Sequence, residues 1–288
     1  MSIFRTDIKV EDPSYENLRD GTNPAEIAGK ELTEALWEQF QPFSDVNFSE
    51  ELAIDFDARF WEMDLTVELL KQGLDVSCPK PGPDVCVTDK GQRLWFEAIC
   101  PKAGSGADEV PSPMVGGITK VPEDQIKLRY TSAIQEKFTK YEKYCAKGII
   151  GKDEPYVIAI NSCQIPSARA DFHPPRIVRT VFPIGGEVLK VNRGTGETTV
   201  SFEFSATVQK ASGTEIDIQY FIDPKYSGIS GILFSYSDCC NRPTSQNDWV
   251  FIHNPLASNP VEHGLVSCAL EYIATESGEN TYELVRVA

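Results

Sequence analysis

The fold of this 288-residue chain depends most on residues 82–99, which read GPDVCVTDKGQRLWFEAI. The segments Asp84–Thr88 and Arg93–Ile99 are rich in β-branched and aromatic residues, which favour strands. A short turn that contains glycine separates them. This pattern predicts a β-hairpin.

A two-residue loop at Lys90–Gly91 would fix the register of this hairpin, because successive side chains of a strand point to opposite faces. Asp84 and Glu97 would then lie directly opposite each other and share one face with Cys86 and Trp95. The other face would be apolar throughout and would carry Val85, Val87, Leu94 and Phe96.

Two opposed carboxylates destabilise a hairpin unless a cation lies between them, because their Cβ atoms are only about 5 Å apart. Mg²⁺ or Mn²⁺ is suited to this position since both prefer oxygen ligands. We therefore predict a metal site at Asp84 and Glu97, with Glu62 as a third carboxylate if its helix packs beside the hairpin. The alternative is that Asp84 is a solvated turn residue and that Glu97 is a solvated strand residue paired with a lysine or arginine.

Helices and strands are expected on both sides of the hairpin. Asn23 before Pro24 starts a helix that ends near Gln39, and apolar residues at steps of three and four predict a second helix from Ser49 or Asp55 to Gln72. A third helix is expected from Glu123 to Lys147. The expected later strands are Val157–Ile160, Thr199–Val208, Glu215–Phe221, Gly231–Tyr236 and Trp249–His253.

This order predicts an α/β (α+β) fold with a central mixed β-sheet flanked by helices. We expect an N-terminal helical extension over residues 1–50, a core over 51–176, and a β-rich elaboration over 177–288 that packs on the same domain. Three roles are open for the elaboration: it enlarges the sheet, roofs a cleft, or forms the interface of a homo-oligomer.

The hairpin motif and the helix before it resemble a known family. Gly82-Pro83-Asp84 stands thirteen residues before Glu97 and follows a helix that contains Glu62, and this order resembles the PD-(D/E)XK nuclease superfamily, the restriction-endonuclease-like fold. The resemblance covers about residues 52–162. It implies a core of helix, three-stranded meander, helix and strand around Mg²⁺, with Glu62 as the helix glutamate, Asp84 as the main metal ligand and Glu97 as the second ligand.

One position departs from the family pattern. The family's lysine lies two residues after the acidic residue, where this chain has Ile99, which cannot orient or deprotonate water. A lysine from the following helix can take that role, and Lys137 is our preferred substitute, with Arg129 and Lys140 nearby on the same helix. The alternative is that these basic residues form a solvated polar face.

Composition restricts the partners. The 43 acidic and 27 basic residues give a net charge of −16, so the chain cannot coat nucleic acid by bulk charge. Contact with nucleic acid would be local and bridged by metal. The absence of a long apolar run and of a signal peptide predicts a soluble, cytoplasmic protein with no membrane contact, and the eight scattered cysteines are expected to be buried free thiols.

Two functions from different classes follow. The first is a divalent-metal-dependent nuclease that hydrolyses phosphodiester bonds, with DNA or RNA and endo- or exonucleolytic action left open. The second is a catalytically inactive nuclease-fold module for binding or assembly. A Cys-His-Asn nucleophilic site at His253 is disfavoured because no cysteine opens a helix, so His253 is expected to cap a strand or line a pocket edge.

Overall fold

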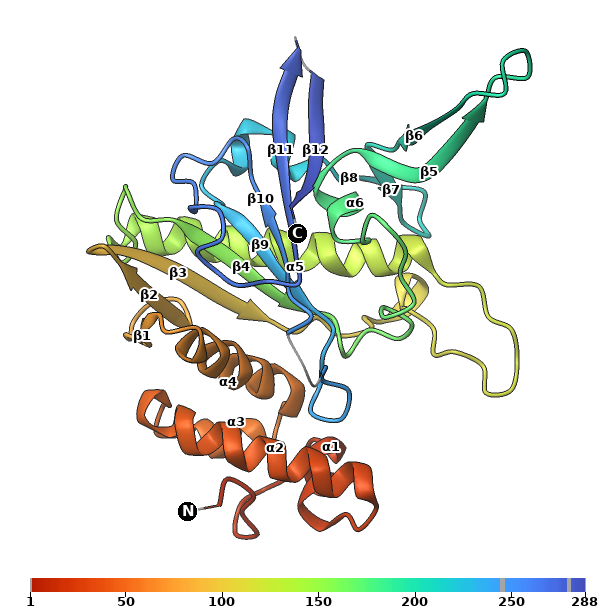
Figure 1. The fold of residues 1–288 in the computed structure, drawn as a ribbon. Coiled ribbons are helices and arrows are strands. Elements are labelled where there is room, and N and C mark those ends of the chain that lie inside the picture. Colours follow the sequence, from red (N-terminus) through yellow and green to blue (C-terminus); the bar gives the residue numbers. More distant parts are fainter. Residues whose placement is uncertain (1, 244–246, 279–280, 288) are drawn as a thin grey trace.

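The computed structural model describes residues 2–243, 247–278 and 281–287. Its centre is an eight-stranded mixed sheet in the order β1-β2-β3-β4-β9-β10-β11-β12 (Figure 1). The strands of this sheet are β1 Asp75–Ser77, β2 Val85–Asp89, β3 Gln92–Ile99, β4 Tyr156–Asn161, β9 Gly231–Ser235, β10 Val250–His253, β11 Leu270–Gly278 and β12 Thr281–Val287. The predicted mixed sheet with flanking helices is confirmed.

The helices match the predicted positions closely where the apolar periodicity is strong. They are α1 Pro13–Asp20, α2 Pro24–Phe40, α3 Phe48–Leu52, α4 Phe56–Lys71, α5 Glu123–Ala146 and α6 Val178–Val181. Asn23 caps α2 as expected, and its side chain and that of Glu26 form a reciprocal capping box. The helix expected to begin at Ser49 or Asp55 is divided into α3 and α4, with a break just before Phe56.

The β2–β3 hairpin has the predicted register. Val85 pairs with Phe96, and Lys90 and Gly91 form the loop with φ of 49° and 84°. Such positive φ values are those of a type I′ turn, which matches the twist of the two strands. Val85 and Phe96 pack with Trp61 of α4, whereas Cys86 and Trp95 pack in the cluster that includes residues of α5. The two helices therefore cover opposite faces of the sheet.

The C-terminal part of the chain extends the sheet beyond β4. β4 lies parallel to β3, β9 parallel to β4, β10 antiparallel to β9, β11 parallel to β10, and β12 antiparallel to β11. Of the three roles considered for this part, enlarging the sheet is observed. Among the described residues, no helix combines the length and the apolar character needed to cross a membrane.

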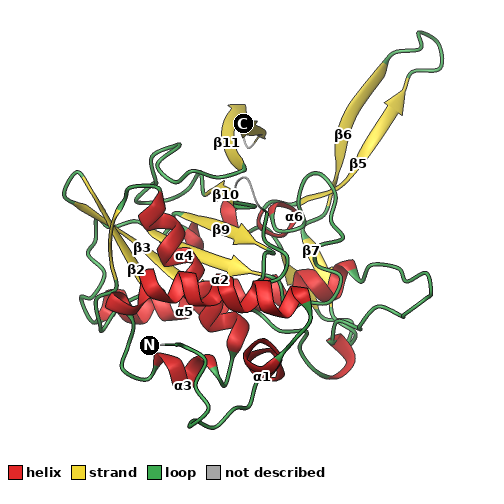
Figure 2. Ribbon diagram, turned by 60° about the horizontal axis from the view of Figure 1, so that its bottom comes forward, coloured by secondary structure: helices red, strands yellow, loops and turns green. Residues whose placement is uncertain are grey.

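Several expected strands differ from the observed ones. The run Thr199–Val208 is divided into β6 Thr198–Phe204 and β7 Thr207–Gln209, because β6 pairs with β5 and β7 pairs with β8. The strand expected from Glu215 ends at Asp217, and a 3₁₀ turn follows. The hairpin of β6 and β5 Ile184–Val191 projects away from the body of the molecule (Figure 2). The remaining short elements are β8 Glu215–Asp217 and the 3₁₀ turns Gln41–Phe43, Gly106–Asp108, Tyr220–Ile222 and Pro224–Tyr226.

The cysteines are free thiols, as expected, but burial varies. Cys86 and Cys100 are buried, whereas Cys145 and Cys240 are exposed. The expectation of burial was wrong for the exposed pair, because Cys145 lies in the last turn of α5 and Cys240 in a surface turn. The other four cysteines are half-buried.

Candidate functional site

A cleft of about 340 Å³ lies where α4, the end of β3 and α5 meet. Glu62, Asp84, Arg129 and Lys137 line this cleft. Glu97 is fully buried beside it and is bonded to Lys137. The structure thus brings together the five residues that the sequence singled out.

Glu97 is the most confined acidic group of the cleft. Its Oε1 accepts hydrogen bonds from Lys137 Nζ at 3.0 Å and from Lys140 Nζ at 2.5 Å. Its Oε2 is buried and has no hydrogen-bond partner among the described residues. Burial, followed by the negative charge of Asp84, raises the pKa of Glu97, while the two lysines oppose this shift. One oxygen of this carboxylate is therefore available to a further cationic partner.

Asp84 lies immediately before β2 and is half-buried. Its Oδ2 accepts a hydrogen bond of 2.8 Å from the backbone N–H of Ala98, the residue that follows Glu97. This bond fixes the Asp84 carboxylate across the hairpin from β3. Within the described ranges, Asp84 forms no ion pair, so no basic side chain is paired with its Oδ1.

Glu62 reaches the cleft from α4, which Trp61 fastens to the sheet by donating from Nε1 to the carbonyl oxygen of Ala159 at 3.0 Å. The Glu62 carboxylate pairs with Arg59 at 2.5 Å, one helical turn earlier. Burial, and next the charge of Asp84, raises the pKa of Glu62 to about 7, although Arg59 lowers it. Glu62 thus exchanges its proton near neutral pH.

Two lysines reach Glu97 from α5. The Lys137 side chain is only 10% exposed, whereas that of Lys140 is 43% exposed. Tyr156 of β4 donates its hydroxyl to the backbone carbonyl of Lys137 at 3.2 Å and so fixes this turn of the helix. Burial tends to lower the pKa of Lys140, but its contact with Glu97 raises that pKa overall. The alternative of a solvated polar face is wrong for Lys137, because its side chain turns inward.

Arg129 packs closely on the loop that follows β3. A Cβ atom added at Gly104 would lie 2.7 Å from Arg129 Nη1, so glycine at this position allows the guanidinium to lie against the backbone. Among the described residues, none forms a hydrogen bond with the buried Nε of Arg129. Arg129 also lines the cleft, where a guanidinium is suited to binding an anion.

The three carboxylates of the cleft do not form a compact triad. In the part of the chain that the structure describes, two groups of three possible metal ligands have all ligand atoms within 4.8 Å of one another, and neither contains Glu62, Asp84 or Glu97. The reason is that Glu62 turns toward Arg59 while Glu97 turns toward its lysines. A cation in this cleft would therefore have to be held by Asp84 and the unpartnered Oε2 of Glu97 rather than by three carboxylates together.

The cleft differs in charge from the whole chain. Basic and acidic groups nearly balance there, despite the net charge of −16. The sequence interpretation missed two basic residues, Arg59 and Lys102, the latter paired with Asp55 at 2.9 Å. Spacing could have indicated Arg59, since it lies three residues before Glu62 on the same helix.

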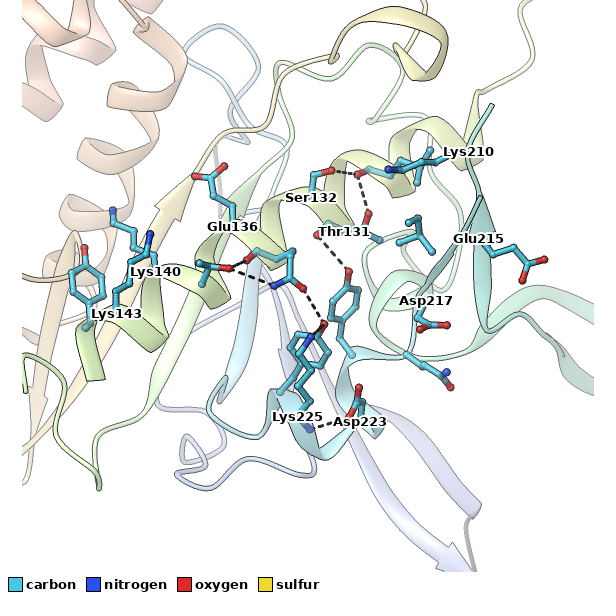
Figure 3. Close-up of a pocket in the computed structure, with 18 of the residues that line it drawn as sticks. Thr131, Ser132, Glu136, Lys140, Lys143, Lys210, Glu215, Asp217, Asp223 and Lys225 are labelled. Carbon is cyan, nitrogen blue, oxygen red and sulfur yellow. Dashed lines mark hydrogen bonds between the residues drawn. The ribbon is translucent and has the colours of Figure 1, made fainter. Parts of the chain in front are cut away.

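A larger pocket of about 1020 Å³ adjoins the cleft along α5 and shares Ser132, Glu136 and Lys140 with it (Figure 3). Its walls carry lysines together with acidic side chains from the segments that face α5. The lysines are Lys140, Lys143, Lys147, Lys210 and Lys225. This pocket was not predicted, because its far wall comes from the β-rich half of the chain.

Replacing Glu62 by glutamine should change how stability depends on pH. In the folded protein the pKa of Glu62 is about 7, above its ordinary value of 4.5. Protonated Glu62 therefore stabilises the fold below pH 4.5, and this stabilisation is lost as the pH rises through 7. As the pH rises from 4.5 to 7, the unfolding free energy of Glu62→Gln should therefore increase by up to about 3 kcal/mol relative to that of the wild type. Urea unfolding at pH 4.5 and pH 8 with a chelator present measures this difference. Glu31→Gln, at an exposed position of α2, is the control, and a difference that does not change with pH would contradict the assignment.

The resemblance to a nuclease family rests on the motif residues and on their meeting in one cleft. Comparison of the chain with protein-family models, with curated proteins and with solved structures found no match in any of the three.

Proposed function

We propose that the protein is a divalent-metal-dependent phosphodiester hydrolase that acts on nucleic acid, with the cleft as its active site. The observation that carries this proposal is the state of Glu97, whose Oε1 binds two lysines while its Oε2 is buried and unpartnered. An unsatisfied buried carboxylate oxygen destabilises a folded protein. Its position beside Asp84 and Glu62 supports a cation as the missing partner.

The chain order around the cleft supports the same proposal. α4 is followed by the antiparallel meander β1–β2–β3, then by α5, and then by β4 parallel to β3. This is the order of helix, meander, helix and strand that the resemblance to the restriction-endonuclease-like fold implies. We therefore propose a core of that type.

The side chains of the cleft have distinct roles in this proposal. Asp84 and Glu97 would hold Mg²⁺ or Mn²⁺, and Glu62 would contact it through water. When bound, the ion would supply positive charge for the phosphoryl oxygens and acidify a bound water. Lys137 Nζ, which donates to Glu97, would orient the attacking water in place of the absent motif lysine. Arg129, which lines the cleft, would bind the scissile phosphate.

The test compares Asp84→Asn with the wild type. We expect Mg²⁺ or Mn²⁺ to raise the Tm of the wild-type protein and to support cleavage of DNA or RNA, and we expect both effects to be lost in Asp84→Asn without unfolding. Thermal denaturation with and without each ion, and cleavage of labelled single- and double-stranded DNA and RNA, provide the measurements. Asp75→Asn, at an exposed position of β1, is the matched control. Equal activity in Asp84→Asn and wild type would rule out the proposal.

The inactive binding or assembly module is the second candidate, and a specific observation favours it. Lys137 and Lys140 both neutralise Glu97, as a site that has replaced its metal with basic side chains would do. This candidate predicts that neither Mg²⁺ nor Mn²⁺ raises the Tm. It also predicts that the wild-type protein does not cleave nucleic acid, so that Lys137→Met would lower stability only.

A further inference from the structure

A second cluster of ionisable side chains lies on the sheet face opposite Glu97. His253 is the last residue of β10, as the sequence predicted for a strand-capping histidine, and Glu271 is the second residue of the neighbouring β11. Phe251 pairs with Glu271 in the parallel register, so His253 and Glu271 share one face of the sheet. The loop between the two strands supplies His263. Because Phe251 packs with Trp61 of α4, this is the α4 face rather than the α5 face.

The three side chains converge closely. His253 Nε2 lies 2.6 Å from Glu271 Oε1, and the rings of His253 and His263 stack with centroids 4.5 Å apart. One ligand atom from each residue lies within 4.8 Å of the others. The backbone N–H of Gly264 donates to Glu271 Oε1 at 3.2 Å and holds this carboxylate in place.

The chemical nature of the three side chains is suited to a metal. Burial lowers the pKa of His253, which is only 6% exposed, although Glu271 acts in the opposite direction. A neutral imidazole is the form that binds metal. Two histidines and a carboxylate, with no thiolate, are typical ligands of Zn²⁺ and similar transition metals rather than of Mg²⁺.

We propose that His253, His263 and Glu271 form a binding site for a divalent transition metal of the Zn²⁺ class. Three protein ligands leave the fourth tetrahedral position open. That position would face the adjoining pocket of about 390 Å³, which Asn254 and Thr275 also line. Binding would replace the hydrogen bond between His253 and Glu271 by two metal bonds, and the exposed His263 would complete the set. The site is independent of the proposed hydrolase cleft, because the two pockets share no lining residue.

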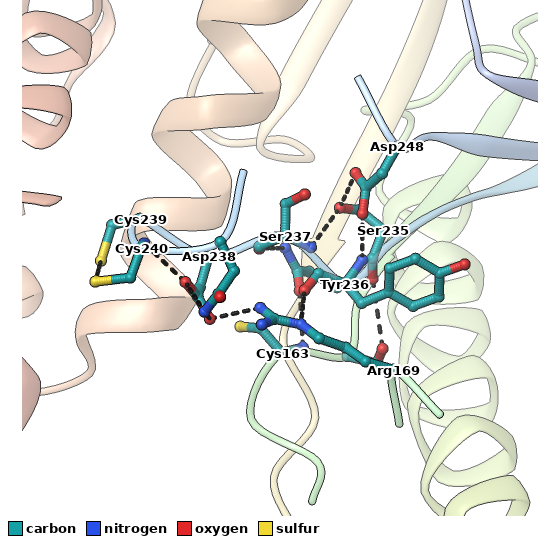
Figure 4. Close-up of polar contacts among 12 residues, drawn as sticks. Cys163, Arg169, Ser235, Tyr236, Ser237, Asp238, Cys239, Cys240 and Asp248 are labelled. Carbon is teal, nitrogen blue, oxygen red and sulfur yellow. Dashed lines mark hydrogen bonds and ion pairs between the residues drawn. The ribbon is translucent and has the colours of Figure 1, made fainter. Parts of the chain in front are cut away.

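Among the residues that the structure describes, one other group of possible ligands could compete for Zn²⁺. Asp238, Cys239 and Cys240 also place their ligand atoms within 4.8 Å of one another, with the two Sγ atoms 3.6 Å apart (Figure 4). Burial and the neighbouring thiol raise the pKa of Cys239, which keeps it protonated, and Arg169 binds the Asp238 carboxylate at 2.5 Å. This thiol group is therefore the control for the histidine site.

The test measures Zn²⁺ binding by calorimetry in the full chain. We expect one site in the wild type, an affinity at least about 100-fold lower in His263→Ala, and wild-type affinity in the double variant Cys239→Ser/Cys240→Ser. His263 is exposed, so its loss should leave the fold intact, which the Tm without metal checks. Co²⁺ bound at the site should show d–d absorption without a thiolate-to-metal charge-transfer band.

Two outcomes would overturn the proposal: unchanged Zn²⁺ affinity in His263→Ala, or loss of binding in the cysteine double variant. Asp84→Asn separates this site from the hydrolase cleft. It should retain Zn²⁺ binding at the histidines whether or not the protein cleaves nucleic acid.

Discussion

Lys137→Met is expected to lower metal-dependent cleavage of nucleic acid by about 10³-fold, the loss typical when a group that orients or deprotonates the nucleophile is removed. The reason is that the Lys137 side chain, only 10% exposed, contacts Glu97, whereas Ile99 stands where the proposed nuclease motif would have its lysine. The rise in Tm on adding Mg²⁺ or Mn²⁺ should persist, because Asp84 and Glu97 remain. Loss of cleavage with a retained rise in Tm would distinguish Lys137 from the proposed metal ligands, because removing a ligand should abolish both cleavage and the rise in Tm.

Single-turnover cleavage at saturating metal measures the effect on the chemical step. Lys140→Met should have the smaller effect, since the Lys140 side chain is 43% exposed and makes its ion pair at the rim of the cleft. Lys71→Met removes the same charge from the exposed last turn of α4 and should leave the rate unchanged. A rate in Lys137→Met equal to that of wild type would remove Lys137 from the mechanism.

Local signals explain why the sequence could predict the hairpin and the position of Asp84. The alternation of residues 84–99 and the Lys90–Gly91 turn determine the register without reference to the rest of the chain. The 3.6-residue period of α5 likewise places Lys137 on the side of the helix that meets β3. The contact between Glu97 and Lys137 could therefore be predicted from the hairpin register, the period of α5, and the assumption that α5 packs against β3.

Features that depend on distant partners were not predictable in this way. Burial and the charge of Asp84 raise the pKa of Glu62, and both depend on how α4 packs beside the hairpin. The cluster of His253, His263 and Glu271 was missed because its spacing follows no familiar motif and a parallel strand pairing creates it. Strand pairing also determined where the run from Thr199 divides, since β6 and β7 pair with different partners.

Arg176→Ala is expected to lower the free energy of unfolding by about 3–5 kcal/mol, the usual loss when one partner of a buried ion pair is removed. Arg176 is fully buried at the point where the sequence suggested that the β-rich elaboration begins. It forms two hydrogen bonds with Glu123, the first residue of α5, at 2.8 and 2.9 Å. It also donates to the carbonyl oxygens of Ala168 and Ala170, so the variant would leave both carbonyls and part of the Glu123 charge without a partner.

Urea unfolding of Arg176→Ala beside Arg169→Ala measures this loss. Arg169 also forms an ion pair, with Asp238, but its side chain is 40% exposed, so we expect a loss below about 1 kcal/mol. Arg176→Lys should recover only part of the stability, because a lysine ammonium cannot reproduce the paired contacts with both oxygens of Glu123. If Arg176→Ala and Arg169→Ala were equally mild, the contact between Arg176 and the start of α5 would not be an important stabilising contact. A large loss specific to Arg176 would mean that the segment after β4 holds the start of α5, the helix that carries Lys137, through this buried arginine.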